Sequence, residues 1–194
     1  MEISAMKMYD VPGSDAFQRF LDKEKAARDI FWNQPLHVPG PLQVPAYAEA
    51  TLRSLTRNDA DLDERVRIRG ERHTALLARL DGDDAPAVHA VIDESVLRRS
   101  AAGSDATRRQ IEHLIELSQR PAVHIGIMPL DRGPHRGLIG PFVVADEMVF
   151  FEGAAGDQLV EDVAASYRDL GRSLMAEAAT DEDARTLMGK LIGR

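Results

Sequence analysis

The sequence predicts a mixed α/β domain, in which a helical N-terminal part packs on a small mixed sheet and C-terminal helices follow. Apolar residues recur at helical spacing over residues 61–80 and 104–119, which is typical of amphipathic helices. Short apolar runs at 87–92 and 122–128 flank the second helix, and such runs between turn signals indicate buried strands. The order strand, helix, strand has the length of a βαβ unit, so we expect these two strands to be parallel.

The N-terminal part is predicted to be a helical front over residues 17–80, preceded by a flexible arm of residues 1–16. Aromatic and aliphatic residues over 15–31 approximate one helical face, so a helix is expected there. Residues 37–45 contain three prolines and a glycine. Because proline lacks a backbone N–H, this stretch is expected to be a rigid loop and not a helix or a strand. A short helix over 46–55 follows this loop.

Residues 81–86 are rich in turn formers and separate the helical front from an α/β back half over 87–194, within one domain that covers 17–194. Two apolar runs within 140–152 are joined by an Asp-Glu pair and predict a hairpin, although the pair lacks the glycine that such turns favour. A helix over 159–178 and a last short helix that starts at a threonine complete the predicted domain.

Composition limits the possible partners. The chain has a formal net charge of −8, whereas nucleic-acid binding needs clustered Lys and Arg, so no nucleic-acid partner is expected. It has no cysteine, and none of its 6 histidines has metal-ligand spacing, so no metal site is predicted. It contains no dinucleotide or phosphate-binding motif, so no cofactor is predicted. No apolar run resembles a signal peptide or a membrane span, which makes a cytoplasmic location the expectation.

Four phrases occur in a fixed order: VPGPLQVPAYAEATL, VIDESVLRR, PAVHIGIMPL and IGPFVVADEMVFFEG. Together they resemble the actinobacterial domain of unknown function that normally lies C-terminal to an Xre-type helix-turn-helix in antitoxin-like transcriptional regulators. The resemblance covers Phe17 to Ile192, which leaves too few residues for a three-helix DNA-binding module. It therefore implies a stand-alone regulatory domain without its DNA-binding half, either as a natural protein or as a fragment of a longer regulator.

The proline loop is the strongest single motif. Pro39 sets the backbone for a turn that Gly40 can complete, so one interpretation is a rigid connector between two helices. The other is a cradle in which backbone amides and Gln43 face a ligand. His37 precedes the turn, and His73 stands where the family more often has glutamine, which makes both histidines candidates for proton transfer.

Charged residues directly follow the first predicted strand. Ligands of open α/β sheets bind beyond the carboxyl ends of the strands, and Glu94 and Arg98 fall at this position. A partly buried Glu94 needs a cation, which Arg98, Arg69 or Arg72 could supply. The pair is either an internal tie between the helical front and the sheet or a binding site for an anion or a carboxylate.

Two further residues complete the predicted ligand-binding set. His124 alternates with apolar neighbours in the second predicted strand, as His89 does in the first, so the two histidines could share one surface. Glu152 closes the predicted hairpin. The loop over 130–141 is rich in glycine and proline and is a candidate lid or an ordinary surface loop.

Two functions remain open. The first is a ligand-sensing or protein-interaction domain that binds a small molecule or a protein partner and could form a homodimer. The alternative is a small biosynthetic or tailoring enzyme of secondary metabolism, in which His37, His73 and Glu94 perform acid/base catalysis in the same pocket. In either case the proline loop, the Arg72 turn and the end of the first predicted strand are expected to converge on one pocket, whose ligand the sequence does not identify.

Overall fold

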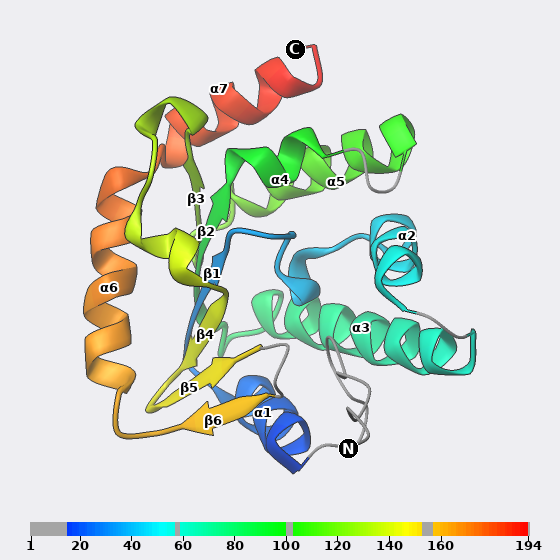
Figure 1. Cartoon of the computed structure of the whole chain (residues 1–194), viewed down its shortest axis with the longest axis vertical. Helices are drawn as coiled ribbons and strands as arrows, with labels where there is room; N and C mark the ends of the chain where they lie inside the picture. Colours follow the sequence, from blue (N-terminus) through cyan, green and yellow to red (C-terminus); the bar gives the residue numbers. More distant parts are fainter. Residues whose placement is uncertain (1–14, 57–58, 100–102, 153–156, 194) are drawn as a thin grey trace, which may run out of the picture.

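The computed structural model describes residues 15–56, 59–99, 103–152 and 157–193 (Figure 1). The predicted arm 1–16 lies outside these residues except for its last two, which open the first helix. The strands are β1 (Asp29–Gln34), β2 (Ala87–Asp93), β3 (Val123–Met128), β4 (Phe142–Ala145), β5 (Met148–Phe151) and β6 (Gln158–Val160). The helices are α1 (Asp15–Ala26), α2 (Pro45–Leu55), α3 (Asp59–Leu80), α4 (Glu94–Arg98), α5 (Gly103–Leu117), α6 (Ala164–Glu177) and α7 (Asp181–Leu191), with 3-10 turns η1 (Gly40–Leu42), η2 (Leu130–Arg132) and η3 (Arg136–Ile139).

All six strands form one mixed sheet in the order β3-β2-β1-β4-β5-β6. The strands β1, β2 and β3 are parallel to one another, whereas β4 pairs antiparallel with β1, and β5 and β6 continue the sheet in antiparallel pairs. The chain passes from β2 to β3 through α4 and α5, so the predicted βαβ unit is confirmed. The predicted fold class, a mixed α/β domain with C-terminal helices, is confirmed as well.

The strand β1 is the main departure from the sequence prediction. The helix predicted over 15–31 ends at Ala26, and the chain then forms the strand that lies between β2 and β4. From Ile30 to Gln34 this strand is buried on both faces, and an apolar run without alternation does not distinguish a strand from a helix. The predicted helical front therefore contains a central strand, and the sheet has two parallel crossovers where one βαβ unit was expected.

The predicted hairpin is confirmed as β4 and β5, joined by Asp146 and Glu147. Asp146 has φ = 48°, the left-handed conformation that glycine usually provides in such a turn. The strand β6 then pairs with β5, although the sequence analysis assigned its last two residues to a helix over 159–178. That helix, α6, begins only at Ala164.

The other helices lie close to their predicted bounds. α2, α3 and α5 each begin within two residues of the predicted start, and α7 begins directly after Thr180. Their apolar residues recur at helical spacing along one face, which explains why the periodicity located them. None of the described helices is long and apolar enough to cross a membrane.

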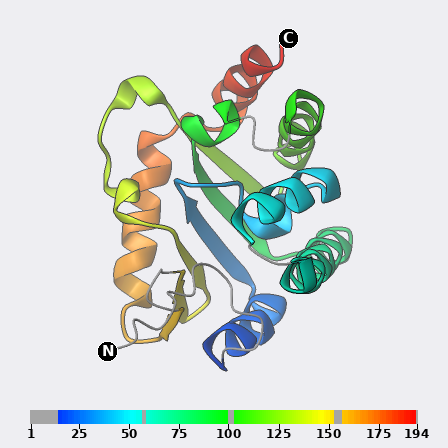
Figure 2. The same cartoon turned by 45° about the vertical axis from the view of Figure 1, so that its right-hand side comes forward.

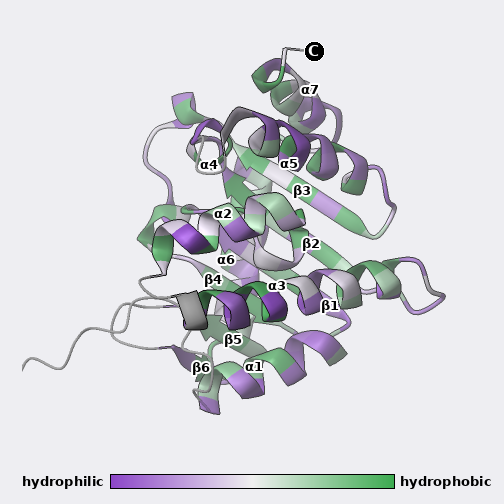
Figure 3. Ribbon diagram, turned by 90° about the vertical axis from the view of Figure 1, so that its right-hand side faces the viewer, coloured by the Kyte–Doolittle hydropathy of each residue, from purple (hydrophilic) through white to green (hydrophobic). Residues whose placement is uncertain are grey.

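Helices cover the two faces of the sheet unequally. α6 lies alone on one face, and α1, α2, α3 and α5 lie on the other (Figure 1). Figure 2 shows β1 between these two layers. Side chains along β1 point alternately to the two faces of the sheet. Ile30 and Trp32 therefore lie in the larger core beneath the helix-rich face, and Phe31 lies in the smaller core beneath α6. Figure 3 views the helix-rich face, where mostly hydrophobic β2 and β3 lie behind helices of mixed hydropathy.

Candidate functional site

The α1–α3 cavity is a space of about 390 Å³ bounded by α1, α3 and β1. Ile30 and Trp32 line it from the strand, and Ile68 and Leu76 line it from α3. Its volume lies within the usual range of small-molecule sites. Polar residues complete the wall: Gln18, Asp22, Glu24, Lys25, Glu64, Arg67, Glu71, Arg72 and Arg79.

Arg72, a predicted ligand-binding residue, lies in the wall of this cavity and pairs with Glu24 of α1. Its Nε and Nη2 atoms donate to the two carboxylate oxygens of Glu24 at 2.7 and 2.8 Å. The two side chains are only 11% and 8% exposed. The guanidinium also lies over the ring of Phe20, 5.2 Å from its centroid. A bidentate ion pair of this kind fixes both side chains. It therefore holds α1 against α3 and makes one wall of the cavity rigid.

Trp32 lines the cavity and carries an unsatisfied donor. The residue is 1% exposed, and its indole N–H has no hydrogen-bond partner among the described residues. A buried donor without an acceptor costs about 1–3 kcal/mol, and buried tryptophan N–H groups usually find a partner. The sequence analysis did not select this residue, because a tryptophan in an apolar run is typical of a core.

The proline loop is held by hydrogen bonds within the protein. The amide of Gln43 donates from Nε2 to the carbonyl of Val38 at 2.7 Å, and its Oε1 accepts from Arg69 at 3.1 Å. Nδ1 of His73 lies 2.9 Å from the carbonyl of Pro41. A Cβ atom on Gly40 would lie 3.0 Å from the Arg69 side chain, so the glycine permits close approach of α3. These contacts, together with the turn that Pro39 starts, favour the rigid-connector interpretation of the loop.

His37 and Glu152 lie side by side. Their Nε2 and Oε2 atoms are 3.8 Å apart, and the side chains are 14% and 12% exposed. Both line a hollow of about 10 Å³ together with Arg69. A space of this size holds about one water molecule. His37 therefore has a carboxylate neighbour for proton transfer, but no room for a substrate beside it.

Glu94 is buried and paired, as the sequence predicted, and its partner is Arg98. Oε1 of Glu94 accepts from Arg98 Nε at 2.7 Å, and Oε2 accepts from the backbone N–H of Leu130 at 2.9 Å. Glu94 is 7% exposed, whereas the Arg98 side chain is 54% exposed. The carboxylate therefore connects α4 to the segment that follows β3.

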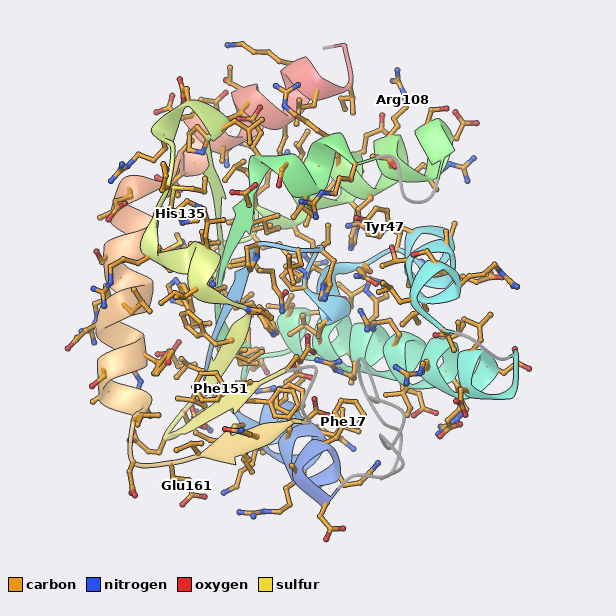
Figure 4. All side chains as sticks on the ribbon, in the orientation of Figure 1. Phe17, Tyr47, Arg108, His135, Phe151 and Glu161 are labelled. Carbon is orange, nitrogen blue, oxygen red and sulfur yellow. The ribbon has the colours of Figure 1, made fainter. Side chains whose placement is uncertain are left out.

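Beside Glu94, a second group of contacts fixes this segment, which we call the edge loop (residues 129–141). Nε2 of His135 lies 3.3 Å from Oδ2 of Asp93. The amide of Asn33, at the end of β1, donates to the carbonyls of Gly137 and Gly140 at 2.8 and 2.9 Å. Figure 4 labels His135 on this segment, beside α6. The loop was predicted as a candidate lid or an ordinary surface loop, and these contacts of His135 and Asn33 were not predicted.

His124 lies on the opposite face of the sheet from Trp32. Its ring stacks on that of His89, with centroids 4.9 Å apart and planes inclined by 19°. Burial lowers the pKa of His89, and the neighbouring His124 lowers it further. Both rings line a cavity of about 430 Å³ beside α6, which we call the α6 cavity, together with Arg168 and Arg172. The expected shared surface of the two histidines is thus confirmed.

The expected convergence on one pocket is only partly met: Pro41 of the proline loop and Arg72 both line the α1–α3 cavity, but the residues at the end of β2 do not. Arg72 lies in the α1–α3 cavity, whereas Glu94 and Arg98 hold the edge loop beyond the end of β2. His37 and Glu152 share a separate small hollow, and His124 lies in the α6 cavity on the other face. The sheet separates the α1–α3 cavity from the α6 cavity, because Trp32 and Phe31 of β1 line them from opposite faces. In the described part of the chain, no three His, Asp or Glu residues are placed to hold a metal ion.

Comparison with known proteins gives a family assignment. Searches of curated proteins and of solved structures found no match. The family model of a domain of unknown function, DUF5753, matches residues 17–190, which include every cavity and contact described above. The match covers well over half of the 194 residues. This chain therefore belongs to the DUF5753 family.

Proposed function

We propose that this chain is a small-molecule-sensing domain and that its ligand binds in the α1–α3 cavity. The observation that carries the proposal is the indole N–H of Trp32, which is buried beside this cavity without a hydrogen-bond partner among the described residues. A ligand with a hydrogen-bond acceptor would satisfy this donor if it displaced the atoms that cover the N–H. Ile30, Ile68 and Leu76 would pack against its apolar or aromatic body.

The charges around the cavity support an uncharged or singly charged ligand. The wall carries four acidic side chains and four basic ones, so they leave no net formal charge: Asp22, Glu24, Glu64, Glu71, Lys25, Arg67, Arg72 and Arg79. Arg72 is satisfied by Glu24, and Arg67 bonds to both Glu64 and Glu71. A strongly anionic ligand would have to compete with these carboxylates. The binding energy would therefore come mainly from burial of the ligand's apolar surface against Ile30, Ile68 and Leu76.

Binding is better supported than catalysis. The three residues of the enzyme hypothesis are separated and engaged: His37 lies in a hollow of about 10 Å³, His73 contacts the Pro41 carbonyl, and Glu94 bonds to Arg98. General acid/base groups must reach one substrate together. The arrangement of these three residues therefore favours a sensor over a tailoring enzyme.

A sensing role also fits the resemblance to the regulatory half of Xre-type regulators. We infer that the chain senses a cytoplasmic metabolite and does not itself bind DNA. Its net charge of −8 opposes binding to a phosphate backbone. A signal would then have to pass to another domain or protein.

The experiment uses Trp32, the one tryptophan of the sequence, as a donor for energy transfer. Anilinonaphthalene sulfonate, an aromatic probe with acceptor oxygens, is titrated into the protein while Trp32 emission is measured. We expect saturable quenching of Trp32, sensitised probe emission and a higher melting temperature, because binding to the folded state stabilises it.

Two phenylalanine variants on one helix provide the control. Ala75 of α3 lines the cavity, whereas Ala78 of the same helix is exposed and does not line it. Ala75→Phe should fill the cavity and weaken probe binding about tenfold or more, and Ala78→Phe should leave it unchanged. Equal binding by both variants, or quenching that does not saturate, would contradict the proposal.

A further inference from the structure

Large hydrophobic side chains are exposed at one edge of the sheet. In the described part of the chain, four of the five such residues follow the carboxyl ends of β1 and β3, and three of these four belong to the edge loop. The four are Leu36 (44% exposed), Leu130 (50%), Leu138 (51%) and Ile139 (79%). Isolated exposed hydrophobic residues are common, but three within ten positions of one loop indicate a contact surface.

The edge loop is firmly held. Asn33 donates to two of its carbonyls, Glu94 accepts from the N–H of Leu130, and Asp93 contacts His135. A Cβ atom on Gly137 would lie 2.7 Å from Oδ1 of Asn33, so the loop also packs closely on the end of β1. The loop therefore presents its hydrophobic side chains on a fixed backbone, which lowers the entropy cost of binding.

Leu36 lies at the same edge. The guanidinium of Arg99 donates to its carbonyl at 3.3 Å, and Arg99 directly follows α4, which carries Glu94 and its bond to Leu130. The loop after β1, the end of α4 and the edge loop are thus joined by hydrogen bonds. We call Leu36, the end of α4 and the edge loop together the edge surface.

Arginines surround these hydrophobic side chains. Arg98, Arg99, Arg132 and Arg136 are all exposed, whereas the edge loop contains a single carboxylate, Asp131. Glu94 pairs with Arg98 and Glu177 with Arg132, but Arg99 and Arg136 form no ion pair with a described residue. The exposed charges of the edge surface are therefore mainly basic, on a chain whose net charge is −8.

We propose that the edge surface binds a segment of a partner protein that combines an apolar face with flanking carboxylates. Apolar burial of Leu138 and Ile139 would supply the affinity, and the arginines would orient the acidic flanks. A second copy of this chain fits less well. In a twofold-symmetric contact the same surface meets itself, so this group of arginines would be brought close to the same group on the other copy.

The test uses two labelled synthetic peptides of about 18 residues, which is about five helical turns. One has leucines on one face and glutamates on the other, and its partner has lysine in place of every glutamate. Fluorescence anisotropy with the full chain should give saturable binding of the acidic peptide, about tenfold or more tighter than binding of the basic peptide.

Substitutions locate the binding. Leu138→Ser with Ile139→Ser, and separately Arg136→Glu, should each weaken the acidic peptide about tenfold, while Arg172→Glu, an exposed arginine of α6, should not. Melting temperatures near the parent value would show that each variant folds. Undetectable binding of the acidic peptide, equal binding of the two peptides, or unchanged affinity in the double serine variant would overturn the proposal. So would sedimentation showing a dimer that becomes monomeric in the double serine variant, because the surface would then bind a second copy.

Discussion

The carboxylate of Asp146 accepts a hydrogen bond at 3.0 Å from the backbone N–H of Asp29, a residue 117 positions earlier in the chain. The backbone of Asp146 also donates to the carbonyl of Asp29 at 3.0 Å. The hairpin turn between β4 and β5 is thereby bonded to the first residue of the central strand β1. This contact fixes where β1 begins and therefore which of its residues face each core.

Substitutions of Asp146 should separate its two roles, the left-handed turn and the bond to β1. Asp146→Ala loses the bonds and keeps the unfavourable φ, so we expect it to be the least stable variant, by roughly 1–2 kcal/mol. Asp146→Gly regains the turn geometry but not the bonds and should lie between Ala and the parent. Asp146→Asn should come closest to the parent, because it tolerates this φ and keeps an acceptor oxygen. Urea unfolding measures the free energy of unfolding of each variant and so gives their order of stability. If Asp146→Gly is more stable than the parent, the hydrogen bonds of the Asp146 carboxylate contribute little to stability.

The pair of Glu24 and Arg72 should behave as a buried ion pair. Glu24→Ala or Arg72→Ala leaves one charge buried without its partner, which typically costs about 3–5 kcal/mol. The double variant Glu24→Leu with Arg72→Met should recover most of this loss, because it removes both charges and keeps apolar volume. Chemical unfolding of the parent, the single variants Glu24→Leu and Arg72→Met, and this double variant measures the coupling energy. Additive losses in the double variant would contradict a direct interaction between these side chains.

The sequence predicted the helices whose periodicity reflects one buried face and the strands whose short apolar runs are bounded by turn residues. The helices α3 and α5 each carry such a stripe, and β2 and β3 are short apolar runs between turns. The strand β1 is buried on both faces, so its apolar run carried no period that excludes a helix.

The candidate site was less predictable, because its contacts join distant residues. The sequence placed Glu94 and Arg98 correctly at the end of a strand, and their spacing of four residues on one helix turn makes the pair visible. By contrast, Arg72 and Glu24 are 48 residues apart and His135 and Asp93 are 42 apart. Local spacing in the sequence does not predict such pairs. They form only when the strands are arranged in their actual order, and β1, which was not predicted, is the central strand of that order.

Glu94→Ala should release the edge loop while costing less than a fully buried ion pair. Arg98 is half exposed and can return to water, so the loss comes mainly from the N–H of Leu130, at about 1–3 kcal/mol. Hydrogen exchange of the Leu130 amide should become faster in this variant. Arg98→Ala keeps the carboxylate and should leave that amide protected. If both variants exchange alike, Glu94 does not anchor the loop.

His89 should make folding sensitive to mild acid. Burial and the adjacent His124 lower its pKa in the folded protein below the ordinary value of about 6.5. The unfolded chain therefore binds more protons than the folded one between the lowered pKa and about 6.5. Stability must then rise with pH through this window and fall on acidification. His113, whose pKa is lowered by burial and by His73, contributes with the same sign.

Urea unfolding between about pH 5 and pH 7, the range in which histidines titrate, tests this assignment. The parent should lose stability as the pH falls, and His89→Gln should lose less, because glutamine does not titrate. His124→Gln should also reduce the slope, since it removes the charge that helps to lower the pKa of His89. The variant with both His89→Gln and His113→Gln should show the smallest dependence. A slope in His89→Gln as steep as that of the parent would mean that other groups control the acid sensitivity.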